Sequence, residues 1–229
     1  MYKIYIDGCP QFNNVFAAGN TNEGQQNIKV GDAVQKYLEA TRQFQVFRPV
    51  TNANWTLDQI IADANSKTGQ GDLYLAIHSN SGGGHGCEAY AYAVNTNSDK
   101  IAHKLYDKIC AISPYAGRGV KYNPLAEVTD TTATAALVEV AFHDNVQEAQ
   151  WLIDNADKIG KALAEGVCEY LGVVITPPVP TPDYKALYEA SREQIKVLDA
   201  QLKSSYSQIQ IATMKLNKYQ KIREEMNKI

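Results

Sequence analysis

A short apolar run that ends in a histidine and a glycine-rich loop most constrains how this chain can fold. Leu73–Ile77 is continuously apolar, and its length favours a fully buried strand over a segment of buried helix. His78 follows directly, and the chain then becomes polar and rich in glycine up to Gly86. In an open α/β sheet, ligands bind in the crevice outside the carboxyl ends of the strands. This stretch therefore predicts a buried strand that presents His78 either to a ligand or as a satisfied histidine at a strand end.

Strand and helix patterns alternate on both sides of this run. Apolar residues recur at helical spacing in the predicted helices, whereas short apolar or alternating runs mark the predicted strands. The predicted strands are residues 3–7, 45–50, 73–78, 88–94 and 136–142, with a further short strand at 125–129. The predicted helices are residues 23–40, 57–66 and 98–112, and one or two helices between 145 and 171. Such alternation predicts an α/β fold with a mixed, mostly parallel sheet between helices.

The composition of the chain changes after residue 174. Residues 175–182 are rich in proline and predict a stiff, extended linker. From residue 183 onward, a long helix is predicted whose apolar residues alternate at spacings of three and four, as in a coiled coil. One set is Tyr188, Ile195, Leu202, Ile209 and Leu216, and the other is Tyr184, Ser191, Leu198, Ser205, Ala212, Tyr219 and Met226. A lone helix cannot bury such a stripe, so we expect a homo-oligomer through residues 183–229. The alternatives are folding back on residues 1–174 and binding another protein.

Composition narrows the classes of function. The 229 residues are 45% hydrophobic and 21% charged, which suits a folded domain at 1–174 followed by the linker and the helix. A net charge of −3 gives no electrostatic footprint for nucleic acid. No window holds the ~18 apolar residues of a membrane span, and no basic and then apolar leader precedes the first strand. We therefore expect a protein made in the cytoplasm without a signal peptide, with neither nucleic acid nor a membrane as its partner.

Two carboxylates and His78 are candidates for hydrolytic chemistry. Amide hydrolysis needs an electrophile, an activated water and a proton shuttle. A zinc ion with three protein ligands and an open position supplies the first two, and a Glu off the metal commonly supplies the third. Glu139 interrupts an apolar strand, where an unpaired charge is costly, and this suits a general base with a raised pKa. Glu23 begins a predicted helix, where favourable charge at the helix N-terminus is the structural alternative.

The remaining histidines and the cysteines are weaker candidates. His85 lies in the glycine-rich loop and is expected to be exposed, and His103 lies in the middle of a predicted helix. His143 leaves a predicted strand, where a structural role is expected. Cys9 and Cys87 lie in predicted loops near the proposed site, where a thiol ligand is the alternative to a reduced thiol without a role.

Four segments in the right order and spacing carry a resemblance to a known family. They are Tyr5–Asp7, Thr21–Glu23, Leu75–Asn80 and Leu137–Asn145. Together they resemble the zinc-dependent N-acetylmuramoyl-L-alanine amidases of the amidase-3 family, which includes phage endolysins and bacterial cell-wall hydrolases. The resemblance covers about residues 1–174 and implies a mixed sheet between helices with Zn²⁺ as the cofactor. It also implies that Glu23 and His78 are zinc ligands and that Glu139 is the catalytic glutamate.

The sequence departs from the family pattern at the first zinc ligand. The family has a histidine in the loop after the first strand, but this chain has no histidine before His78. Counting back from Glu23, that slot falls on Asn13, or on Pro10 if the loop is aligned differently. Asn13 could coordinate through its carbonyl oxygen, a hard donor that suits zinc poorly. A replacement ligand such as His85 or Cys9, loss of the metal, or substitution of a natural histidine at Asn13 would equally account for the departure.

The resemblance implies an enzyme that hydrolyses peptidoglycan at the amide between N-acetylmuramic acid and L-alanine of the stem peptide. Metal would polarise the carbonyl, and Glu139 would take a proton from water and pass it to the leaving amine. The alternative is a catalytically impaired wall-binding or phage structural module that lost a zinc ligand. A third reading, a zinc carboxypeptidase, would use a spaced His-x-x-Glu pair. Without a signal peptide, the expected route to the cell wall is release in the manner of a phage lysin.

Overall fold

A mixed sheet organises the first part of the chain. In the computed structural model, which describes residues 1–8, 11–49, 55–177 and 184–227, six strands follow the order β2-β1-β3-β6-β4-β5. The strands are β1 (Tyr2–Asp7), β2 (Phe44–Phe47), β3 (Leu73–Asn80), β4 (Glu88–Tyr90), β5 (Val120–Lys121) and β6 (Thr134–Phe142). All neighbours are parallel except β4 and β6, which are antiparallel. The predicted mixed, mostly parallel sheet is confirmed.

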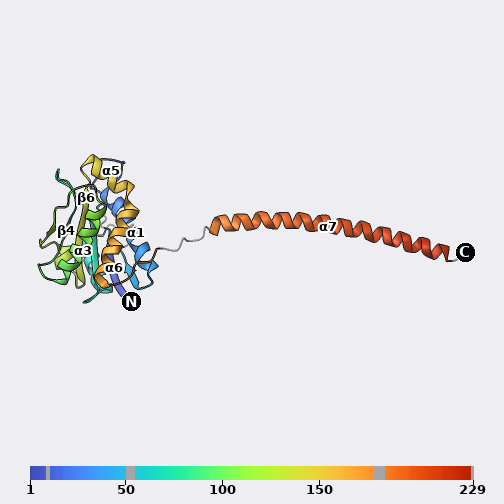
Figure 1. Cartoon of the computed structure of the whole chain (residues 1–229), viewed down its shortest axis with the longest axis horizontal. Helices are drawn as coiled ribbons and strands as arrows, with labels where there is room; N and C mark the ends of the chain where they lie inside the picture. The colour runs from blue at the N-terminus through green and yellow to red at the C-terminus, as the bar shows by residue number, and fades with distance from the viewer. Residues whose placement is uncertain (9–10, 50–54, 178–183, 228–229) are drawn as a thin grey trace. The chain divides into compact units, whose positions relative to one another are not determined.

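Helices cover both faces of this sheet. They are α1 (Glu23–Ala40), α2 (Leu57–Lys67), α3 (Asn97–Ile112), α4 (Ala126–Thr129), α5 (Val146–Asp154) and α6 (Ala156–Leu171). Helices α1, α3 and α6 pack side by side over one face (Figure 1), where they build the larger apolar core. A smaller core on the other face includes Ile60 of α2 and Val128 beside Tyr74 of the sheet. The fold is therefore a three-layer α/β arrangement.

The alternation of side chains along β3 decides which face receives His78. Successive side chains of a strand point to opposite faces. Leu73, Leu75 and Ile77 join the larger core, and Tyr74 and Ala76 join the smaller one. His78 continues the second set, so it lies on the face that α2 and α4 cover.

Two predicted strands differ from the structure, and one observed strand was not predicted. The strand predicted at 125–129 is wrong, because Ala126–Thr129 forms the single helical turn α4. The Leu125 carbonyl accepts hydrogen bonds from the N–H groups of Val128 and Thr129, which closes this turn. The strand predicted at 88–94 ends at Tyr90, and β5 lies in a stretch predicted as loop.

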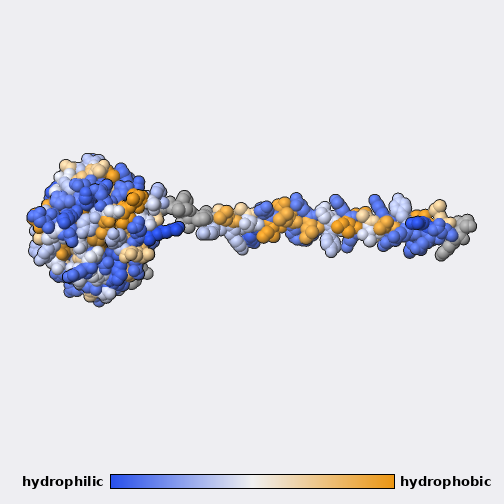
Figure 2. Space-filling model, turned by 60° about the horizontal axis from the view of Figure 1, so that its bottom comes forward, coloured by the Kyte–Doolittle hydropathy of each residue, from blue (hydrophilic) through white to orange (hydrophobic). Residues whose placement is uncertain are grey.

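The chain divides into two compact units, Met1–Val179 and Pro180–Ile229. The second contains the long helix α7 (Tyr184–Met226), a helix of 43 residues of which none is buried. Its apolar side chains lie exposed along its length, as the orange patches of Figure 2 show. The helix itself is confirmed, and pairing of its stripe with another copy stays a prediction.

Some expectations fall on parts of the chain that the structure does not describe. Residues 178–183, which include most of the predicted linker, lie outside the described residues, and so do Cys9 and Pro10. In the described part, none of the helices combines the length and the apolar character that crossing a membrane requires.

Candidate active site

The candidate site lies at the carboxyl ends of β3 and β6. His78 of β3 pairs in register with Glu139 of β6, and Glu139 pairs in turn with Glu88 of β4. Side chains directly opposite each other on neighbouring strands lie on the same face of the sheet. Glu23 reaches the same place from the first turn of α1, which Asn22 caps by accepting a hydrogen bond from the N–H of Gln25. The structure thus brings Glu23, His78 and Glu139 together.

His78 lies between two buried carboxylates. Its Nδ1 is 3.3 Å from Oε1 of Glu23, and its Nε2 is 3.4 Å from Oε1 of Glu127. All three residues are buried. Burial, the largest single influence, acts to raise the pKa of both carboxyl groups, but contact with His78 and hydrogen bonds from neighbouring groups together lower the pKa of each. A carboxylate oxygen therefore lies close to each of the two imidazole nitrogens.

The protein also fixes the Glu23 carboxylate through hydrogen bonds. Its Oε1 accepts from the Ser79 N–H at 3.0 Å and from Nδ2 of Asn27 at 3.3 Å. Its Oε2 accepts from Nδ2 of Asn14 at 2.6 Å. A carboxylate that only favoured the N-terminus of a helix would not need these partners. These contacts indicate that Glu23 does more than place a favourable charge at the N-terminus of α1, which was the structural alternative.

Glu139 has the environment of a general base. Its Oε2 is buried and has no hydrogen-bond partner among the described residues. Burial raises the pKa of Glu139 to about 7, against the opposing effect of His78 and with the help of the charges on Glu23, Glu88 and Glu127. A carboxyl group with a pKa near the working pH is suited to both accepting and returning a proton.

The donor atoms of Glu23 and His78 fit one half of a zinc site. Two ligands that are each ~2.0–2.1 Å from a tetrahedral zinc ion lie about 3.3–3.4 Å apart, and Glu23 Oε1 and His78 Nδ1 are separated by 3.3 Å. Glu127 faces the other imidazole nitrogen, as carboxylates behind metal-bound histidines do. Over the described ranges, no group of three or more His, Cys, Asp or Glu is arranged to hold a metal ion.

The loop after β1 places Asn14 rather than Asn13 beside this pair. Asn13 is exposed, whereas the Asn14 amide donates to Glu23 and to Oε1 of Gln11. Rotation of the Asn14 amide by half a turn would present its oxygen instead. His85 is not the replacement, because its Nδ1 lies 3.1 Å from Oε1 of Glu148 and its side chain is 69% exposed.

Glu148 of α5 ties the glycine-rich loop to the end of β6. This fully buried carboxylate accepts hydrogen bonds from the Gly86 N–H at 3.1 Å and from the Phe142 N–H at 2.7 Å. Gly86 has φ +89°, and a side chain there would collide with the Ala116 carbonyl. The loop therefore has a defined path past the site.

The only His-x-x-Glu spacing in the sequence, His85–Glu88, does not form a pair. His85 contacts Glu148, whereas Glu88 accepts hydrogen bonds from Arg118 and Lys121. This separation does not support the carboxypeptidase alternative.

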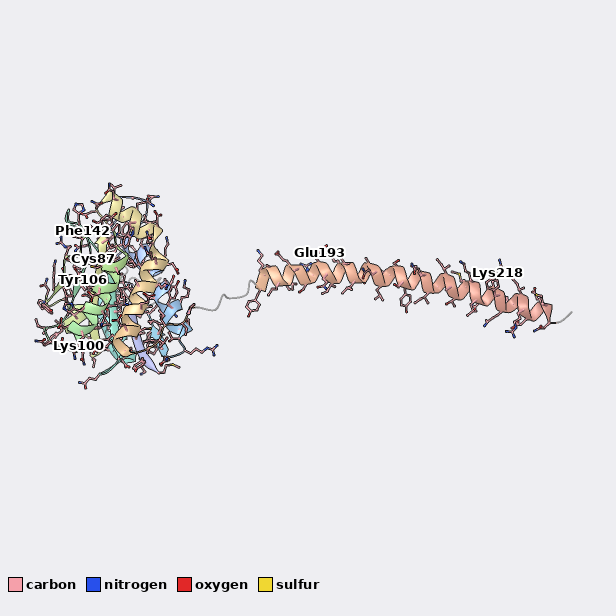
Figure 3. All side chains as sticks on the ribbon, in the orientation of Figure 1. Cys87, Lys100, Tyr106, Phe142, Glu193 and Lys218 are labelled. Carbon is pink, nitrogen blue, oxygen red and sulfur yellow. The ribbon has the colours of Figure 1, made fainter. Side chains whose placement is uncertain are left out.

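The other expected residues have structural contacts. His143 is buried, stacks on Phe16 and lies 3.0 Å from Ser79 Oγ through its Nδ1, and His103 lies 3.3 Å from Asp99 on the surface of α3. Cys87, labelled in Figure 3, has its sulfur 3.0 Å from that of Cys110, so its nearest polar partner is another thiol.

Sequence reasoning missed Glu127 and Glu88. Glu127 falls in the segment predicted as a strand, where its acidic side chain between apolar neighbours was the available signal. Glu88 directly follows the glycine-rich loop. Nothing in the sequence indicates that it lies opposite Glu139 on the neighbouring strand.

The fold and the site together indicate the class of protein. His78 lies between the carboxylates of Glu23 and Glu127, and a third carboxyl group, Glu139, has a pKa near neutral. Such a set of groups at the carboxyl ends of strands in an α/β sheet is suited to hydrolysis. The family model of N-acetylmuramoyl-L-alanine amidases (amidase-3) matches residues 11–169. The chain belongs to this family.

Relatives and solved structures agree with this assignment. The chain is 28% identical over 176 residues to the N-acetylmuramoyl-L-alanine amidase LytC of Bacillus subtilis, covering 73% of this chain and 35% of LytC. It is 28% identical to an endolysin of Bacillus phage SPP1, covering 69% and 61% of the two chains. It therefore spans about a third of the length of LytC.

The fold matches the catalytic domain of the amidase CwlV from Bacillus (Paenibacillus) polymyxa with a TM-score of 0.67 at 24% identity. That match covers 76% of this chain and 100% of the other. An N-acetylmuramoyl-L-alanine amidase of Clostridium difficile 630 matches with the same TM-score at 21% identity, covering 75% and 97%.

Proposed function

We propose that this chain hydrolyses peptidoglycan at the amide between N-acetylmuramic acid and the L-alanine of the stem peptide. Membership of the amidase family supports the bond that is cut. The observation that carries the proposal is the placement of Glu139, with its pKa of about 7, opposite the buried His78. Glu139 would act as the proton acceptor beside Glu23 and His78, the two residues positioned to bind a cation.

Glu23 and His78 are the residues that would hold Zn²⁺. The third position belongs to the loop after β1, where Asn13 is the slot expected from the sequence and Asn14 is the residue in contact with Glu23. When bound, zinc polarises a carbonyl and lowers the pKa of a bound water to ~7. Nδ1 of His78 faces Glu23 and Nε2 faces Glu127, so Nδ1 is the nitrogen that would bind the metal beside Glu23.

Glu139 carries the proton transfers in this proposal. Its carboxylate takes a proton from the attacking water as the water oxygen bonds to the lactyl carbonyl carbon. The protonated carboxyl then gives this proton to the nitrogen of L-alanine as the carbon–nitrogen bond breaks. The products are a muramic acid carboxyl group, which keeps the second proton of the water until it passes to solvent or to the amine, and a free peptide amine. Glu139 returns to its starting state.

Purified full-length protein incubated with peptidoglycan tests the proposal. Stem peptides with a free amino-terminal L-alanine should appear by mass spectrometry, with more product when zinc is added. Glu139→Gln is the matched control, because it keeps the shape of the side chain and removes the base. Absence of such peptides from folded, zinc-supplemented protein would reject the enzymatic function.

A wall-binding module without catalysis is the second candidate. It is favoured by one observation, the asparagines that stand in the loop where a third zinc ligand is expected. Sedimentation with purified cell walls together with elemental analysis separates the two functions. Binding to walls without stoichiometric zinc and without released peptides would support the module.

The proposal also includes the oligomeric state of the protein and the way in which it reaches the cell wall. The exposed stripe of α7 supports a homo-oligomer through residues 183–229, because a helix with no buried residue gains stability from burying that stripe against a copy. Similarity to a phage endolysin supports action at the bacterial cell wall after release in the manner of a phage lysin.

A further inference from the structure

Two cations share one buried carboxylate beside the candidate site. Oε2 of Glu88 accepts a hydrogen bond from Nε of Arg118 and another from Nζ of Lys121, both at 2.5 Å. Its Oε1 accepts from Nδ2 of Asn80 at 2.8 Å and from the Tyr90 hydroxyl at 2.6 Å. Glu88 is thus fully engaged. The single negative charge of Glu88 therefore does not by itself neutralise both cations.

The cations face outward although their carboxylate is buried. The side chain of Glu88 is 2% exposed, whereas those of Arg118 and Lys121 are 39% and 34% exposed. Arg118 uses only Nε for Glu88, and its two Nη groups donate to no residue in the described part of the chain. The Phe142 ring, 5.1 Å from Cζ, supports the guanidinium from one side. A guanidinium held in this way presents the planar fork that binds a carboxylate with two hydrogen bonds.

This pair of cations lies next to the proposed general base. Glu88 is directly opposite Glu139 across β4 and β6, so both side chains lie on the same face of the sheet. Asn80, which also bonds Glu88, lies two residues beyond His78 on β3. A substrate whose amide reaches Glu139 therefore passes close to Arg118 and Lys121.

We propose that Arg118 and Lys121 form a subsite for a carboxylate in the peptide part of the substrate, which makes the enzyme selective for stem peptides that carry a free carboxylate near the scissile amide. This inference rests on the proposed function, since it assigns a substrate feature to the same site. If Arg118 and Lys121 serve only to neutralise Glu88, the enzyme should show no such selectivity.

Two soluble muramoyl-L-alanyl peptides test the subsite, one with a free side-chain or α-carboxylate after L-alanine and the other with a carboxamide there. We expect kcat/KM for the carboxylate peptide to be at least about tenfold higher, because a hydrogen bond between two charged groups is stronger than one to a neutral amide. Arg118→Lys keeps a cation for Glu88 but loses the fork. It should lower kcat/KM for the carboxylate peptide, through KM, by a larger factor than kcat/KM for the carboxamide peptide. Lys104→Gln, on the surface of α3, is the control for loss of a cation elsewhere.

Equal kcat/KM values for the two peptides with the unaltered protein would overturn the subsite, and so would an unchanged preference in Arg118→Lys. If neither peptide is cleaved, the proposed function fails, and calorimetric titration of both peptides still decides the subsite. Tighter binding of the carboxylate peptide that Arg118→Lys removes would support it, and equal binding would overturn it.

Discussion

His78 and Glu139 lie directly opposite each other on the parallel strands β3 and β6, but the two side chains have different surroundings. The nitrogens of His78 lie 3.3 Å from Glu23 and 3.4 Å from Glu127, whereas burial is the largest influence on Glu139. As a result, the pKa of Glu23 is lowered and that of Glu139 is raised to about 7. Carboxyl groups whose pKa values are pushed apart take different roles, one as a fixed anion and the other as a proton carrier.

Replacing Glu139 by Gln should abolish hydrolysis and increase stability at alkaline pH. The folded state raises the pKa of Glu139 from 4.5 to about 7, so it disfavours the charged form. Below about pH 4.5 the carboxyl is protonated in both states, and the unaltered protein carries no penalty. Between about pH 4.5 and 7 the penalty grows, and above this range it is constant at about 3 kcal/mol.

Urea unfolding at about pH 4, 6 and 8 checks this expectation. The free energy of unfolding of Glu139→Gln should exceed that of the unaltered protein by an amount that increases with pH. Glu39→Gln, an exposed change on α1, is the control for removing a carboxylate from the protein surface. A constant difference for Glu139→Gln would mean that folding does not shift the pKa of this carboxyl group.

A histidine at position 14 should raise zinc affinity more than a histidine at position 13. The Asn14 side chain already contacts Glu23, so an imidazole there can complete a set of two histidines and one carboxylate. We expect Asn14→His to strengthen zinc binding at least about tenfold, measured by competition with a chelator. Asn13→His is the matched variant, and a larger gain from it would return the ligand slot to Asn13.

Replacing Glu127 by Gln should weaken zinc binding without unfolding the protein. The carboxylate 3.4 Å from Nε2 of His78 strengthens the imidazole as a ligand and fixes its orientation. A neutral amide supplies less of this effect, and we expect a loss of about 10-fold to 100-fold in zinc affinity. Asp130→Asn, an exposed change just after α4, should leave affinity unchanged. Equal affinity for Glu127→Gln and the unaltered protein would show that the carboxylate does not act through His78.

Removing the residues after Pro182 should leave a folded monomer, whereas the full chain should be oligomeric by light scattering. A single charge in the stripe should have a similar effect, because it cannot be buried between paired helices. Ile209→Asp lies in the predicted seam, and Ile211→Asp lies outside it on the same helix. We expect only the first to dissociate the oligomer. Equal behaviour of the two variants would contradict the assigned seam.

The sequence predicted the parts of the site that regular strands position. The apolar runs before His78 and around Glu139 are long enough to define β3 and β6, and the alternation of side chains then follows. Glu127 was missed because α4 has four residues, too few for a helical period to be visible. Glu88, Arg118 and Lys121 meet only through strand pairing and tertiary contacts, which no local pattern reports. The choice between Asn13 and Asn14 depends on the path of an irregular loop.

The burial of Glu148 makes one wall of the site a single cooperative unit. Its carboxylate accepts hydrogen bonds from Gly86 in the loop and from Phe142 at the end of β6. Opening either segment alone would leave a buried charge with fewer partners, which is costly. The amide hydrogens of Gly86 and Phe142 should therefore exchange with solvent deuterium at the same free energy of opening, close to that of the surrounding sheet. The glycine-rich loop would then behave as part of the rigid framework against which the substrate is positioned.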